Sequence, residues 1–227
     1  MSPTSRLVAF DLDGVLYSSE PFLGEAYREA IENVNAKRPG SFARVPATRE
    51  ILDHVGWTIA QIFARVFPAA APEALRLLHA ETLTVICDHV ARGDGILYAD
   101  VRETLQALRA RGYQLAVASN GRTQYVETVL ATYALSELFI PRVTADMVGD
   151  KTSVLRFYPY RLGIPPASVV MIGDRASDVE AAQAVGCRFI GCDYGHGYRH
   201  EIEHAGPLVS RFADLPSIVA RELSTTG

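Results

Sequence analysis

The chain contains 227 residues, of which 48% are hydrophobic, and its formal net charge is -4 at pH 7. No run of Lys or Arg supplies the basic surface that nucleic acid or an anionic membrane requires, so we expect neither as a partner. The length exceeds that of a typical domain and predicts either one domain carrying an insertion or two small domains.

The start of the chain does not have the pattern of a secretion signal, because Asp11 and Asp13 interrupt its first apolar run. No other run approaches the roughly 18 apolar residues that a membrane helix needs. The three cysteines form no C-x-x-C pair, and their odd number favours reduced thiols. We therefore expect a cytoplasmic protein without a membrane span.

The first predicted element is a buried strand at residues 6–10, a short apolar run stopped by charged residues. The next segment, residues 18–97, has apolar residues at helical spacing, and we expect no strand in it. A link rich in Pro, Gly and Arg at residues 37–46 divides its first helical pattern from the others. This segment is predicted to be an all-helical insertion.

The remainder of the chain alternates strand and helix patterns. Strands are predicted at residues 114–119, 168–173 and 187–192, with weaker candidates at 139–143 and 207–211. Helices are predicted at residues 101–112, ending at Gly112, and at 177–186, with a Ser177–Glu180 capping box and an end at Gly186. This alternation predicts βαβ units in a parallel sheet, and hence an α/β fold. An insertion after the first strand would lie over the crevice where such sheets bind ligands.

Chemically active side chains follow the predicted strands, at the edge where parallel strands end together. They are Asp11 and Asp13 after the first strand, Ser119, Asn120 and Gly121 after the second, Asp174 and Asp178 after strand 168–173, and Lys151 between the last two groups. Crowded carboxylates repel one another unless a cation lies among them, and hard oxygen ligands suit Mg²⁺ together with a substrate phosphate.

This inventory indicates phosphoryl transfer. Ser119 and Lys151 are candidates to bind phosphoryl oxygens. Asp11, the first residue after the strand, is placed as a nucleophile that forms an aspartyl-phosphate. Asp13 is displaced from it and is the candidate that protonates the leaving oxygen and later activates water.

The motifs DLDGV, SNG, the lone Lys151 and GDRASD resemble, in this order, the four motifs of the haloacid dehalogenase (HAD) superfamily. The resemblance covers the whole chain and is to the helical-cap subfamily that includes phosphoglycolate phosphatase-like enzymes. It implies a Rossmann-like core of residues 1–17 and 98–227, and a cap of residues 18–97. The implied ligands of Mg²⁺ are the Asp11 carboxylate, the Asp13 backbone carbonyl and Asp174, with Asp178 as a supporting carboxylate.

The resemblance also implies catalytic roles for Asp11, Asp13, Ser119 and Lys151, and substrate binding by Ser119, Asn120, Gly121 and Lys151. Three positions depart from the family pattern: Val15 replaces the usual Thr, Ser18 replaces a frequent Asp, and Lys151 lacks the proline that follows it in many relatives.

The expected activity is Mg²⁺-dependent hydrolysis of a small phosphorylated metabolite. A β-phosphoglucomutase-like phosphomutase and a non-catalytic binding module on the same fold remain alternatives. Dehalogenation is disfavoured, because a halide leaves without the proton that Asp13 supplies. Arg44, Arg49, His54 and Arg122 are candidates to contact a second anion on the substrate, and the sequence leaves the substrate and the oligomeric state open.

The segment HEIEH, from His200 to His204, matches the H-E-x-x-H pattern of zinc proteases. That chemistry needs both histidines on one face of a sustained helix and a third ligand beyond it. Gly206 and Pro207 stop any helix directly after His204, and we therefore expect exposed polar residues rather than a zinc site.

Overall fold

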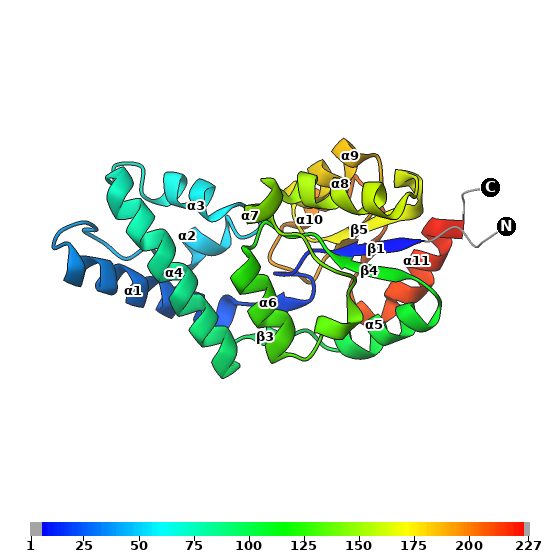
Figure 1. Ribbon diagram of the computed structural model, residues 1–227, viewed down its shortest axis with the longest axis horizontal. Helices are drawn as coiled ribbons and strands as arrows, with labels where there is room; N and C mark the ends of the chain where they lie inside the picture. Colours follow the sequence, from blue (N-terminus) through cyan, green and yellow to red (C-terminus); the bar gives the residue numbers. More distant parts are fainter. Residues whose placement is uncertain (1–5, 225–227) are drawn as a thin grey trace.

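A computed structural model describes residues 6–224 of the chain. Its centre is a parallel five-stranded sheet in the order β4-β1-β5-β6-β7 (Figure 1). The strands are β1 (Leu7–Phe10), β4 (Gln114–Val117), β5 (Val169–Gly173), β6 (Arg188–Cys192) and β7 (Leu208–Val209). The predicted α/β fold with a Rossmann-like parallel sheet is confirmed.

Helices cover both faces of this sheet, as the short, fully apolar strands require. One face packs on α8 (Lys151–Leu162) and α9 (Ala176–Val185), and the other packs on α5 (Val101–Ala110) and α11 (Leu215–Ser224). α6 (Thr123–Thr132) follows β4 and also contacts the helical insertion. The remaining short helices are η1 (Ser136–Leu138), α7 (Ala145–Val148), η2 (Pro166–Ser168), α10 (Arg199–Ile202) and η3 (Phe212–Asp214).

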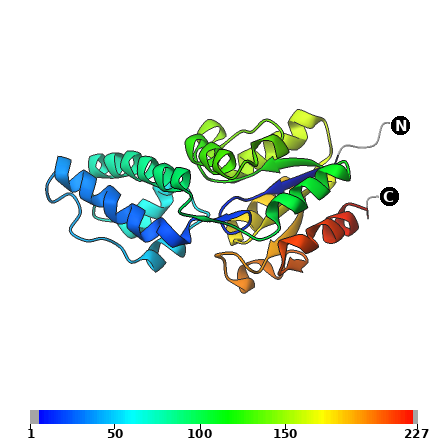
Figure 2. The same cartoon turned by 90° about the horizontal axis from the view of Figure 1, so that it is seen from below.

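The helical insertion, residues 18–97, lies beyond the ends of the sheet strands at one end of an elongated molecule (Figures 1 and 2). Its helices are α1 (Glu20–Lys37), α2 (Thr48–Leu52), α3 (Ile59–Val66) and α4 (Pro72–Arg92), and α1 packs along α4. None of the described helices is long and apolar enough to cross a membrane.

The expectation that residues 18–97 contain no strand is wrong in detail. β2 (Tyr17–Ser18) and β3 (Ile96–Leu97) pair antiparallel where the chain enters and leaves the helical insertion. A two-residue ladder leaves no periodic signal in a sequence. It ties the two connections together at the point where the insertion meets the sheet.

Two other local predictions are also corrected. Residues 139–143 form a loop beside β4, where the Ile140 N–H donates to the Leu115 carbonyl over 2.9 Å. Pro141 follows and has no N–H to continue a ladder. The predicted strand 207–211 shrinks to β7, whereas the ends at Gly112 and Gly186 are confirmed by positive φ values of +86° and +79°.

The predicted capping box at Ser177 is wrong, because α9 already begins at Ala176. Asp178 closes the first turn instead: its Oδ2 accepts hydrogen bonds from the backbone N–H groups of Asp174 (3.1 Å) and Arg175 (3.0 Å). A carboxylate in this place stabilises the N-terminus of the helix. It also connects the helix start to the end of β5.

Candidate active site

The site is built at the shared edge of three neighbouring strands. β1 lies between β4 and β5, so the residues that follow them, Asp11, Ser119 and Asp174, leave the sheet side by side. The Asp11 N–H still donates to the Ile172 carbonyl over 2.9 Å, which fixes the start of the first loop. The parallel sheet therefore brings together side chains that are far apart in the sequence.

Three buried carboxylates form a cluster at this edge. Oxygen atoms of Asp11, Asp174 and Asp178 lie within 4.8 Å of one another. Burial raises the pKa of Asp174 well above its usual value, and the charges of Asp178 and Asp11 raise it further. A cation among these oxygens would relieve that repulsion.

The donor set also fits a divalent metal. Asp174 Oδ2 accepts hydrogen bonds from the backbone N–H groups of His196 (2.7 Å) and Gly197 (3.0 Å), whereas its Oδ1 is buried without a partner among the described residues. A buried, unpartnered carboxylate oxygen is costly, and a cation of the Mg²⁺ class would satisfy it. Gly14 makes room, since a Cβ there would lie 2.2 Å from Asp174 Oδ2, and its φ of +82° also favours glycine.

Lys151, the first residue of α8, places its ammonium group inside the acidic cluster. Its Nζ lies 2.8 Å from Asp11 Oδ2 and 2.5 Å from Asp178 Oδ1. Burial alone would lower the pKa of Lys151, but the two carboxylates outweigh it and raise the pKa above its usual value. The lysine is therefore a fixed positive charge beside Asp11.

Asp178 uses both carboxylate oxygens for protein contacts, Oδ1 with Lys151 and Oδ2 with the backbone. Its role as a supporting metal carboxylate remains a prediction. The contacts in the structure assign it a positioning task, since it orients Lys151 and the loop that carries Asp174.

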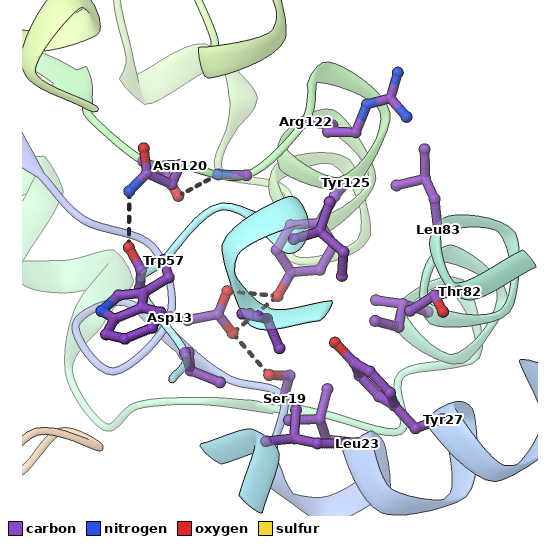
Figure 3. Close-up of a pocket in the computed structure, with 18 of the residues that line it drawn as sticks. Asp13, Ser19, Leu23, Tyr27, Trp57, Thr82, Leu83, Asn120, Arg122 and Tyr125 are labelled. Atoms are coloured by element: carbon purple, nitrogen blue, oxygen red, sulfur yellow. Dashed lines mark hydrogen bonds between the residues drawn. The ribbon is translucent and has the colours of Figure 1, made fainter. Parts of the chain in front are cut away.

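Asp13 faces away from the acidic cluster and toward the helical insertion. The Tyr125 hydroxyl lies 2.8 Å from both Asp13 carboxylate oxygens, and the Ser19 hydroxyl donates to Oδ1 over 2.8 Å (Figure 3). Burial raises the pKa of Asp13, although the Tyr125 hydrogen bond works against this shift. A carboxyl group with a raised pKa is suited to carry and release a proton.

Sequence reasoning missed Tyr125. The only signal for it is its place in the first turn of the helix after the SNG motif, a turn that begins at the same sheet edge. That signal gives its position but not its partner.

The SNG loop after β4 is held in a fixed shape. Ser119 Oγ accepts a hydrogen bond from the Gly121 N–H over 3.1 Å. Asn120 bridges two parts of the molecule: its Oδ1 accepts from the Lys151 N–H (2.7 Å), and its Nδ2 donates to the Gly56 carbonyl (2.8 Å). The loop thus connects Lys151 with the helical insertion.

A cavity of about 120 Å³ lies between the sheet edge and the helical insertion (Figure 3). Asp11, Asp13 and the SNG loop form its floor. The insertion supplies its walls, which are largely apolar and include Leu23, Ile51, Val55, Ile59, Ile62 and Leu83. A ligand in this cavity would contact Asp11 at one end and the insertion at the other.

The insertion is also bound to the sheet side by backbone contacts at residues 53–56. Arg175 donates one guanidinium nitrogen to the Asp53 carbonyl and another to the His196 carbonyl, the latter over 3.2 Å. Ser177 Oγ lies 3.4 Å from the Gly56 carbonyl. Sequence reasoning missed Arg175, because its partners are backbone atoms of a distant segment.

Of the candidates for a second anion, only Arg122 lines the cavity. Arg44 forms two hydrogen bonds of 2.9 Å with Glu50, and Arg49 pairs with Asp53 over 2.7 Å. His54 Nδ1 lies 3.1 Å from the backbone carbonyl of Glu50. Arg49 also donates to the Tyr198 hydroxyl over 2.5 Å. All three side chains thus have protein partners and lie outside the cavity lining.

The HEIEH segment does not form a sustained helix. α10 spans only Arg199–Ile202, so His204 lies beyond its end, as the following Gly206–Pro207 pair predicts. His200 stacks on the Tyr198 ring instead, with ring centroids 5.6 Å apart.

Comparison with known proteins identifies the family of the chain. The family model described as "Hydrolase: haloacid dehalogenase-like hydrolase" matches residues 5–186. A phosphoglycolate phosphatase of Haemophilus influenzae (strain 86-028NP) is 29% identical over 238 residues, covering 96% of this chain and 100% of that protein. One of Pectobacterium atrosepticum is 30% identical, covering 96% and 94%.

Solved structures share the fold. A predicted phosphoglycolate phosphatase from Haemophilus somnus has a TM-score of 0.82 at 24% identity, covering 96% of this chain and 99% of that one. CbbY from Rhodobacter sphaeroides in complex with phosphate has a TM-score of 0.76 at 22% identity, covering 93% and 96%. With the ordered motifs, the parallel sheet and the matched family model all in agreement, the chain belongs to the haloacid dehalogenase-like hydrolases.

Proposed function

We propose that this hydrolase is a phosphatase that cleaves small phosphate monoesters through an aspartyl-phosphate on Asp11, with Mg²⁺ as its metal. The observation that carries the proposal is the buried Lys151 ammonium 2.8 Å from Asp11 Oδ2, beside the unpartnered Oδ1 of Asp174. A fixed cation next to a nucleophilic carboxylate, with oxygen ligands left over for a metal, suits the phosphoryl group of a substrate.

In the first half of the reaction, a carboxylate oxygen of Asp11 attacks the phosphorus atom, and the bond from phosphorus to the leaving oxygen breaks. Asp13 transfers a proton to that oxygen, and the alcohol leaves. Ser119 and Asn120, on the floor of the cavity, orient the phosphoryl oxygens, and Lys151 balances part of their charge.

In the second half, the ionised Asp13 takes a proton from a water molecule, which attacks the phosphorus atom of the aspartyl-phosphate. The bond from phosphorus to Asp11 breaks, phosphate leaves, and the Asp11 carboxylate is restored. Asp11, Asp174 and the Asp13 backbone carbonyl would hold Mg²⁺, which supplies charge neutralisation at the phosphoryl oxygens when bound. Asp178 keeps Lys151 in place by its 2.5 Å contact.

We also propose that residues 18–97 act as a cap on a core formed by residues 1–17 and 98–227. The cap supplies the cavity walls opposite Asp11 and is attached by the contacts of Asn120 and Arg175 to the Gly56 and Asp53 carbonyls. Opening the cap, which would also break the Arg49–Tyr198 contact and separate α4 from α6, would let substrate enter, and closing it would exclude bulk water.

Hydrolysis is favoured over the phosphomutase alternative. A mutase must hold a second phosphoryl group at the far end of its pocket, and here that end is largely apolar, with Arg122 as the one cationic side chain among the described lining residues. An apolar wall would leave the charges of that group unpaired.

The test is phosphate release from a set of phosphorylated metabolites, with and without Mg²⁺, by the parent protein and by Asp11→Asn. The parent is expected to release free phosphate and Asp11→Asn to release none, since an amide is a poor nucleophile. The far-ultraviolet circular dichroism of the variant serves as the folding control. Equal rates for the two proteins, or an isomerised sugar phosphate in place of free phosphate, would contradict the proposal.

A further inference from the structure

The part of the cavity that faces away from Asp11 is largely apolar. α1 contributes Leu23, α2 contributes Ile51, α3 contributes Ile59 and Ile62, and α4 contributes Leu83. An uncharged hydrocarbon group loses nothing by desolvation against such a wall, whereas an unpaired carboxylate loses its hydration without compensation. The wall therefore selects the leaving group by its polarity.

Arg122 is the only cationic side chain among the described residues that line the cavity, and its charge has protein partners. Its Nη1 lies 3.4 Å from His79 Nε2, and its Nε lies 3.8 Å from Asp146 Oδ2. Its guanidinium group points away from Asp13 (Figure 3). It is poorly placed to neutralise a second anion that enters with the phosphoryl group on Asp11.

The other polar groups of the wall are neutral. Burial, with a smaller effect of the Arg122 charge, lowers the pKa of His79 below its usual value, so its imidazole is uncharged at pH 7. Burial raises the pKa of Tyr27, whose hydroxyl therefore stays protonated. Tyr27 lines the cavity and makes no side-chain hydrogen bond among the described residues, so its hydroxyl is left for a neutral polar atom of a ligand.

We infer that the substrate is the phosphate monoester of a compact, uncharged and largely apolar alcohol, rather than an ester that carries a second anionic group. The inference rests on the proposed phosphatase reaction and narrows its substrate class. The cavity volume also favours a compact alcohol. A protein cavity of about 150 Å³ accommodates benzene, and the cavity beside Asp11 measures about 120 Å³. The relatives called phosphoglycolate phosphatases bear a name that implies a carboxylate on the leaving group, so this chain would differ from them in specificity.

The test compares kcat/KM, in Mg²⁺, for isobutyl phosphate and phosphoglycolate. The two esters have the same number of heavy atoms, because an isopropyl group replaces the carboxylate. Isobutyl phosphate is expected to be preferred by about tenfold or more, since the two added methyl groups are buried and no anion is desolvated. Leu83→Lys, which adds a cation to the wall, is expected to shift the ratio toward phosphoglycolate by about tenfold.

Tyr160→Lys is the matched control, because the Tyr160 side chain is 86% exposed and lies outside the cavity lining. This variant should leave the ratio of the two kcat/KM values unchanged. A parent enzyme that prefers phosphoglycolate, and that loses this preference in Arg122→Met, would overturn the inference. Absence of phosphate release from every monoester would instead refute the proposed reaction. Calorimetric binding of the same two esters then decides the inference separately: tighter isobutyl phosphate supports it, and tighter or equal phosphoglycolate overturns it.

Discussion

Replacing Thr82 by valine is predicted to stabilise the protein. Thr82 lies on α4 with 0% exposure, and its hydroxyl has no hydrogen-bond partner among the described residues. An unsatisfied buried polar group costs about 1–3 kcal/mol, and valine has nearly the same shape and a similar helix propensity. Taking the low end, Thr82→Val should raise the free energy of unfolding by about 1 kcal/mol. For a chain of this size, that raises Tm by about 2–4 °C.

Thr84→Val, on the same helix, is the matched control for this prediction. The Thr84 hydroxyl is exposed and donates to the Ala80 carbonyl over 3.1 Å, so its loss should change stability by less than about 0.5 kcal/mol. Urea unfolding and differential scanning calorimetry of the parent and both variants measure the effect. A Thr82→Val protein less stable than the parent by 1 kcal/mol or more would show that this hydroxyl finds a partner in solution, and the reasoning from burial would fail.

Three further predictions concern the site. Lys151→Ala should lower kcat by about 10² or more, because the positive charge beside Asp11 is lost. Lys37→Ala, which removes a lysine from an exposed ion pair, is the control. A loss below about threefold in Lys151→Ala would contradict the role of Lys151. Excess EDTA should abolish phosphate release and added Mg²⁺ should restore it, whereas unchanged turnover in EDTA would rule out the metal. Trp57→Ala changes a residue of the cavity lining and should change the ranking of substrates by kcat/KM. Arg44→Ala changes a residue that is paired with Glu50 outside the lining and should leave the ranking unchanged. Equal changes in both variants would contradict the proposal that the cap wall determines selectivity.

The floor of the site could be predicted because it depends on short-range rules. Asp11, Ser119 and Asp174 each follow an apolar strand, and parallel strands end at one edge. Their proximity therefore follows from the alternation of strands and helices. The same rules placed the helix ends at Gly112 and Gly186, where glycine accommodates the positive φ.

The contacts between the helical insertion and the sheet could not be predicted in this way. Ser19 reaches Asp13, and Arg175 reaches the Asp53 carbonyl, only because the two parts of the chain pack in one relative orientation. No periodicity encodes that orientation. Arg44 and Arg49 lie outside the cavity lining, and each pairs with an acidic residue nearby in the sequence, Glu50 and Asp53.

The identity of the nucleophile is the central claim, and trapping the covalent intermediate tests it most directly. The protein is mixed with a phosphate monoester and Mg²⁺, quenched in acid during turnover and treated with borohydride, which reduces an acyl phosphate to an alcohol. Peptide mass spectrometry should then find homoserine at position 11, because the Asp11 carboxylate lies beside Lys151 on the floor of the cavity. The homoserine should form only when substrate is present, and it should be absent from Asp11→Asn. Reduction at Asp13, Asp174 or Asp178 instead, or an unmodified Asp11 in an enzyme that is turning over, would contradict the account.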